Sequence, residues 1–181
     1  MSISFFSLSA FAQNDIYYSW AKGIGGDSED SGSSVAVDGS GNVYITGHFN
    51  GTADFDPGSG TANLTASGSV DIFFAKYDVS GNYVWAKSIG STDYDDGCSI
   101  AVDGAGNVYI TGFFNGTADF DPGSGVNNLT AVGTSYDIFF AKYDVSGNYI
   151  WAKSIGGASS DISYSIAVDG AGNVYITGSF Y

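Results

Sequence analysis

Apolar and polar positions along the chain fall into short runs that suit β-strands. Residues 34–37, 43–46, 71–77 and 83–85 are rich in valine, isoleucine and aromatic side chains. Such residues favour strands, and no segment has the apolar spacing of an amphipathic helix. The pattern predicts four strands, called A, B, C and D in this order. Short turns with glycine and asparagine join A to B and C to D.

The whole set of strands recurs along the chain. The motif Asp-Gly-x-Gly-Asn-Val-Tyr-Ile-Thr-Gly begins at Asp38, Asp103 and Asp169, so the repeats are 65 and 66 residues long. Short connections favour antiparallel neighbours, and strand C carries apolar residues on both faces, which need packing partners on both sides. An array of this period predicts an all-β fold, a β-propeller built of four-stranded antiparallel blades.

The repeats also set the expected boundaries. Within a partial propeller over residues 13–181, we expect a lone outer strand (15–25), a blade (33–90), a second blade (98–156) and half of a third (164–181). These pieces do not close a ring, so we expect the remaining blades in the same full-length chain. The half-blade is expected to leave unpaired strand edges, which favour association.

The first residues differ from the repeats. Residues 1–12 form a short apolar run that ends in Ala-Phe-Ala, which predicts a cleaved secretory signal peptide and a secreted or cell-surface location. The alternative is an apolar N-terminal strand. This run is too short to span a bilayer, and no later segment is long enough, so we expect no membrane span.

Composition narrows the chemistry further. The 19 acidic residues against five basic ones give a net charge of -14, which repels phosphate backbones and excludes nucleic acid as a partner. Cys98 is the single cysteine, so an intrachain disulfide is excluded. His48 is the single histidine, and its repeat equivalents are Phe113 and Ser179, which favours a side chain at a loop rim.

Several motifs carry a family resemblance. They are Trp-Ala-Lys-x-Ile-Gly, Asp-Phe-Asp-Pro-Gly, Asp-Ile-Phe-Phe-Ala-Lys-Tyr-Asp and the repeated Asp-Gly-x-Gly-Asn turn with its strand. Together they resemble the bacterial beta-propeller repeat family SBBP (seven-bladed beta-propeller), and the turn is also similar to that of NHL repeats. The resemblance covers residues 15–181. It implies secreted or cell-surface bacterial proteins, often large and multidomain, and it supplies no catalytic residues.

Antiparallel strands sort the connections onto two faces. The D–A and B–C connections form one face, the loop face, and the A–B and C–D turns form the other, the turn face. On the turn face, we expect the first aspartate of each turn to accept backbone N–H bonds. These aspartates are Asp38, Asp78, Asp103, Asp144 and Asp169.

The loop face is where the repeats vary, and varied loops on a rigid scaffold usually carry binding specificity. Asp30, Asp95 and Asp161 recur in the D–A loops, and Tyr94 precedes Asp95. These four residues are our candidate ligand contacts, for a carbohydrate or protein ligand. The alternative is a set of solvated acidic loops.

Two Asp-Phe-Asp-Pro-Gly segments are the candidate metal sites. Asp54 and Asp56, and equivalently Asp119 and Asp121, place two carboxylates one residue apart before a glycine turn, as at the start of a calcium loop. Ca²⁺ is thus the one candidate cofactor. The alternative is a turn held by the aspartate side chains and proline.

Repetition of nearly every reactive group favours a scaffold over a single active site. We therefore predict a non-enzymatic secreted or cell-surface propeller scaffold that presents loops to a carbohydrate or protein ligand. One alternative is an extracellular hydrolase or lyase with Asp30, Asp95 and Asp161 at the propeller axis, because paired carboxylates serve glycoside chemistry. A further alternative is a structural spacer in a large surface protein.

Overall fold

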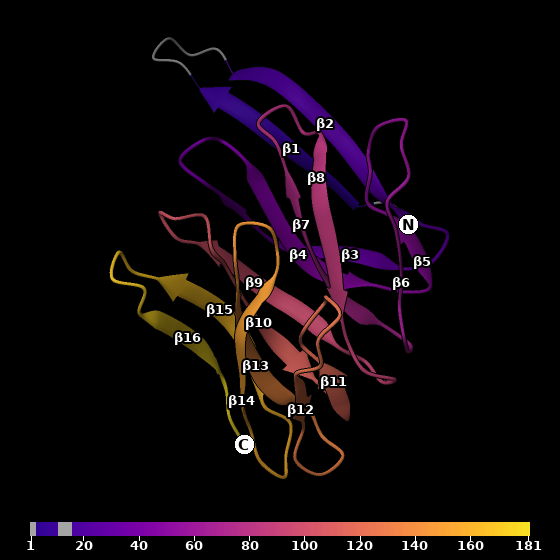
Figure 1. Ribbon diagram of the computed structural model, residues 1–181, viewed down its shortest axis with the longest axis vertical. Helices are drawn as coiled ribbons and strands as arrows, with labels where there is room; N and C mark the ends of the chain where they lie inside the picture. Colours follow the sequence, from indigo (N-terminus) through magenta and orange to yellow (C-terminus); the bar gives the residue numbers. More distant parts are fainter. Residues whose placement is uncertain (1–2, 11–15) are drawn as a thin grey trace.

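The computed structural model describes residues 3–10 and 16–181, and every regular element in these ranges is a β-strand. Successive antiparallel sheets follow one another along the molecule, from β1 and β2 at one end to β15 and β16 at the other (Figure 1). The predicted all-β fold of antiparallel blades is confirmed. Among the described residues, no helix is long and apolar enough to cross a membrane.

Two complete blades have the predicted four-stranded order. The first contains β3 (Asp30–Val37), β4 (Val43–Phe49), β7 (Asp71–Tyr77) and β8 (Tyr83–Ile89). The second contains β9 (Asp96–Val102), β10 (Val108–Phe114), β13 (Asp137–Tyr143) and β14 (Tyr149–Ile155). The pair β15 (Ile162–Val168) and β16 (Val174–Ser179) corresponds to strands A and B of a third blade.

The N-terminal strand of type D has neighbours on both sides. This strand, β2 (Ile16–Gly26), pairs antiparallel with β1 (Ile3–Ala10), and Gly25 pairs with Asp54 on its other side. It is thus not a lone strand. Of the predicted signal peptide, residues 3–10 form β1, and the rest of residues 1–12 lies outside the described ranges. Removal of this segment stays a prediction.

The long B–C connections contain a feature that the sequence reading did not predict. Each holds a short hairpin, β5 (Thr52–Asp54) with β6 (Asn63–Thr65), and β11 (Thr117–Asp119) with β12 (Asn128–Thr130). Gly90, directly after β8, forms a β-bridge to Asp119, as Gly25 pairs with Asp54. Each hairpin therefore joins its own blade to the D strand of the preceding one.

Aromatic side chains fill the core of each blade. Phe55 and Phe120, from the Asp-Phe-Asp-Pro-Gly segments, are fully buried. The Tyr77 hydroxyl donates to the carbonyl oxygen of Phe55 at 3.0 Å, and Tyr143 does the same to Phe120 at 3.0 Å. A buried phenol needs such a partner, so these bonds fix the hairpins against the blades.

Polar contacts of equivalent residues connect neighbouring blades. Trp20 donates its indole N–H to the Val79 carbonyl oxygen at 3.1 Å, and Trp85 donates to that of Val145 at 3.2 Å. On the adjacent A strands, the Ser34 hydroxyl oxygen accepts the backbone N–H of Ile100 at 3.3 Å. Each blade is thus held by the next at both its outer and its inner strand.

Candidate functional site

The turn-face aspartates have the structural role that the sequence predicts. Asp38 Oδ1 accepts the backbone N–H groups of Ser40 and Asn42 at 2.9 and 3.0 Å, while Oδ2 accepts the Asn42 amide and the Tyr44 hydroxyl at 2.8 and 3.1 Å. Burial alone would raise the pKa of Asp38, but these bonds outweigh it and hold the pKa below its usual value. The turns are therefore closed by an ionised carboxylate.

The recurring loop-face aspartates are buried. Asp95 is fully buried, with Oδ2 accepting the Ser91 N–H at 2.5 Å and Oδ1 accepting the Asn115 N–H at 3.0 Å. Burial raises the pKa of Asp95 to about 6, although the Ser91 and Asn115 bonds oppose this rise. The carboxylate thereby ties the D–A loop to the B–C connection. Direct ligand contact by Asp95 stays a prediction.

Asp30 and Asp161 have equivalent positions. Asp30 accepts the Gly26 N–H at 2.8 Å, and Asp161 accepts the N–H groups of Gly157 and Tyr181 at 2.8 and 2.9 Å. Asp161 also lines a hollow of about 310 Å³ with Phe180 and Tyr181. All three recurrent aspartates thus brace loops, and ligand contact by Asp30 or Asp161 stays a prediction too.

The candidate calcium residues also bind backbone groups. Asp54 Oδ1 accepts the N–H groups of Asp56 and Ala62 at 3.0 and 2.8 Å, and Asp56 Oδ1 accepts that of Gly58 at 2.8 Å. Asp119 and Asp121 make the equivalent bonds. Within the described residues, no group of three or more potential metal ligands gathers. The carboxylates close the hairpin turn, and calcium binding there stays a prediction.

Tyr94 belongs to a cluster of rings on the loop face. Its ring is stacked on Phe113 with centroids 6.0 Å apart and planes inclined by 14°, and Tyr136 packs edge-on against both. We call Tyr94, Phe113 and Tyr136 the aromatic cluster. They come from the D–A loop, the end of β10 and the B–C connection, and each is partly exposed. The sequence singled out Tyr94, but not the two rings that it meets.

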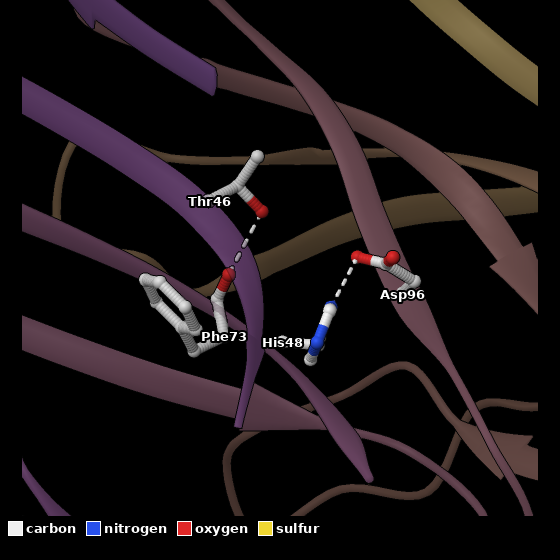
Figure 2. Close-up of polar contacts among 4 residues, drawn as sticks. All are labelled: Thr46, His48, Phe73 and Asp96. Atoms are coloured by element: carbon white, nitrogen blue, oxygen red, sulfur yellow. Dashed lines mark hydrogen bonds and ion pairs between the residues drawn. The ribbon is translucent and has the colours of Figure 1, made fainter. Parts of the chain in front are cut away.

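His48 lies beside this cluster and bridges two blades. Its ring centroid is 5.7 Å from that of Tyr94, and its Nδ1 is 3.1 Å from Asp96 Oδ1 of the next blade (Figure 2). The two side chains are only 12% and 16% exposed. The Asp96 carboxylate outweighs the effect of burial and raises the pKa of His48. The expected loop-rim histidine is therefore half of an inter-blade ion pair.

The same strand carries a second polar contact. The Thr46 hydroxyl donates to the Phe73 carbonyl oxygen at 2.8 Å, as Figure 2 shows, and Thr46 is fully buried. This bond crosses from β4 to β7 within one blade and fixes the strand that presents His48.

Cys98 lies on β9, and burial with the Asp96 charge raises the pKa of its thiol to about 12. An un-ionised thiol is a poor nucleophile.

These features define a class: a repeat β-propeller whose loop face carries an aromatic cluster. The family model for the SBBP beta-propeller repeat matches residues 20–56, 84–113 and 150–179, just over half of the chain. The chain belongs to this family, as its motifs indicated.

Two curated proteins are similar to part of the chain. An uncharacterized WD repeat-containing protein of Acanthamoeba polyphaga mimivirus is 34% identical over 111 residues, which cover 54% of this chain and 8% of that protein. Regulatory protein FlaEY of Caulobacter vibrioides is 32% identical over 111 residues, covering 61% of this chain and 12% of that protein. The chain therefore spans only a small part of the length of either relative.

Proposed function

We propose that this repeat scaffold is a non-catalytic, secreted or cell-surface protein that binds a carbohydrate or protein ligand through its loop face. The observation that carries the proposal is the aromatic cluster. Stacked, partly exposed rings offer a rigid apolar surface, and such rings lose little conformational freedom on binding. The cluster lies on the face whose loops differ between repeats, where a scaffold places specificity.

Charge favours a ligand that is neutral or basic. Glu29 and Asp96 lie close enough to raise the pKa of the Tyr94 hydroxyl, although burial is the larger cause. Their carboxylates are able to accept hydrogen bonds from sugar hydroxyls or to attract basic side chains. The same charges repel phosphate and other anions.

The hydrolase or lyase alternative has less support. Its proposed acids, Asp30, Asp95 and Asp161, are at most 5% exposed and hold backbone N–H groups. A carboxylate in that position lacks the open approach that a general acid or nucleophile requires. Similarity to repeat proteins also agrees with a scaffold.

A binding screen tests the proposal. The whole 181-residue chain is applied to a glycan array and to a panel of extracellular-matrix proteins. We expect saturable binding that Tyr94→Ala weakens at least about tenfold, a loss typical of a central interface residue. Tyr164→Ala is the matched control, because Tyr164 is 61% exposed and lies outside the aromatic cluster. Absence of binding to every glycan and protein, or equal binding by the Tyr94 variant, would contradict the proposal.

A further inference from the structure

Two equivalent grooves lie on the turn face, opposite the aromatic cluster. The first groove has a volume of about 350 Å³ and runs between the A–B turns of the first and second blades, beside Gly39, Gly104 and Lys76. The second groove, of about 420 Å³, runs between the next pair of turns, beside Gly104, Gly170 and Lys142. Both volumes lie in the lower range of ligand pockets in proteins. The grooves therefore recur once per blade interface.

Three of the glycines along the grooves are not required by the backbone conformation. Gly39, Gly104 and Gly170 have no positive φ, and a Cβ at any of them would meet nothing within 4 Å. The C–D turns share the Asp-x-x-Gly-Asn form of the A–B turns, yet they carry Val79 and Val145 at the equivalent position. Turn geometry thus accepts a branched side chain. Glycine at all three A–B turns instead leaves the groove walls open.

The ammonium group of a largely buried lysine lines the first groove. Lys76 is only 8% exposed, and its Nζ lies 5.0 Å from the centre of the Tyr44 ring. Among the described residues, the ion pairs do not include Lys76, so no carboxylate lies within 4.0 Å of this Nζ. Lys142 sits over Tyr109 in the same way at 5.0 Å and lines the second groove. An ammonium has three N–H donors, so each lysine still has donors to offer.

The charges around the grooves select the kind of ligand. Asp38 and Asp103 border the first groove, and hydrogen bonds hold the pKa of each below its usual value despite burial. Two carboxylates repel an anion, while Lys76 repels a cation. Hydroxyl groups accept from an ammonium and donate to carboxylate or carbonyl oxygens. A neutral molecule with several hydroxyls satisfies both kinds of group.

We propose that each groove binds one neutral sugar ring, with a hydroxyl oxygen accepting from the lysine ammonium and the ring lying against the two glycine turns. This adds a binding face to the loop face of the proposed function and does not depend on it. Because the grooves repeat at each blade interface, the chain presents equivalent sites side by side. Adjacent sites on one scaffold raise the avidity for a glycan with several sugar units.

The test uses the ¹⁵N-labelled 181-residue chain and four neutral probes, the methyl glycosides of glucose, galactose, mannose and N-acetylglucosamine. We expect at least one probe to cause saturable shifts of the Gly39, Gly104 and Gly170 amide signals. Gly39→Val should abolish the response of the first groove alone, and Gly170→Val that of the second alone. Gly104→Val should abolish both, because Gly104 lines both grooves.

A second set of variants isolates the ammonium. Lys76→Met keeps most of the apolar stem and should weaken binding in the first groove at least about tenfold. Lys153→Met is the control, because Lys153 is exposed and lines neither groove. The proposal is overturned if none of the four glycosides gives saturable shifts, or if the Gly104 variant keeps them. Stronger shifts with sodium acetate than with any glycoside would also overturn it. Tyr94→Ala should leave the groove responses unchanged, so failure here and failure on the loop face are distinguishable.

Discussion

At the scale of single residues, the same position of the repeat serves different chemistry in different copies. His48 faces Asp96 across the first blade interface, whereas the equivalent positions at the next interface hold Phe113 and Ile162. An ion pair thus stands where its repeat copy has an apolar pair. Because only one of the two interfaces carries this ion pair, the pair should make the free energy of unfolding depend on pH. The residues at the equivalent positions of the next repeat are the natural substitutions for testing this.

The buried Asp95 should make stability fall between about pH 4 and pH 6. Its folded pKa of about 6 exceeds the unfolded value of 3.8, so the folded state binds more protons in this window and loses stability as pH rises. A rise of about two units corresponds to roughly 2–3 kcal/mol in the free energy of unfolding. Urea titrations at several pH values measure it. Asp95→Asn removes the titrating group and should flatten this slope, and an unchanged slope in the variant would contradict the assignment.

The His48–Asp96 pair should add a loss of stability at higher pH. Asp96 raises the pKa of His48, so its contribution is fully present below the unfolded value of 6.5 and disappears as pH rises through the higher folded pKa. We expect an effect on the order of 1 kcal/mol, as for a partly buried ion pair. The double variant His48→Phe with Asp96→Ile copies the next interface and should remove the dependence. If the wild-type chain shows no change across this window, the pair contributes nothing to stability.

At the scale of elements, the strands follow directly from the sequence because period, turns and apolar alternation agree. The hairpins β5–β6 and β11–β12 were missed because three-residue strands resemble a loop. Their signal was present in Thr-Ala-Asp and Asn-Leu-Thr. In each triplet one apolar residue, Ala53 or Leu64, stands between two polar residues, as in a short strand with one buried face. The meeting of Tyr94 with Phe113 and Tyr136, and of His48 with Asp96, depends on the packing of blades and loops, which a one-dimensional pattern does not contain.

The C–D turn at Gly81 packs against the Trp20 ring of the preceding strand, and a methyl group added at Gly81 should lower the free energy of unfolding. Gly81 has φ of 75°, and an added Cβ would lie 2.9 Å from Cδ2 of the Trp20 ring. Gly172 has a similar φ of 83°, but the nearest atom to its added Cβ is the Tyr109 hydroxyl at 4.0 Å. Both alanine variants should lose about 1–2 kcal/mol from backbone strain. Gly81→Ala should lose at least about 1 kcal/mol more, because it displaces the indole.

Chemical denaturation of the two variants measures that difference. Tryptophan fluorescence follows the unfolding, and Gly172→Ala is the matched control for backbone strain alone. Equal losses in the two variants would show that the Trp20 contact contributes nothing. Trp20 also donates its indole N–H to Val79 at 3.1 Å, so a displaced ring should lose this bond as well.

At the scale of the whole molecule, the main contacts between blades in the described ranges join direct neighbours, so stability should vary along the chain. Strand β7 is buried throughout, whereas β16 has no fully buried residue and β15 has Ile166 as its buried apolar side chain. In arrays of this kind, stability is a sum of repeat and interface terms, and separate parts open independently. The chain should therefore not unfold as a single cooperative unit.

Hydrogen exchange followed by mass spectrometry tests this expectation. Amides of β15 and β16 should exchange at least about a hundredfold faster than those of β4 and β7, because fewer buried contacts hold them. Ile166→Ala should lower the free energy of unfolding of the β15–β16 pair by about 2–4 kcal/mol. In an array of nearest neighbours, that loss accelerates exchange in β15 and β16 while β4 and β7, which lie beyond the second blade, keep their rates. If exchange in β4 and β7 accelerated by the same factor, the blades would instead form one cooperative unit, and the grooves between them would open and close together.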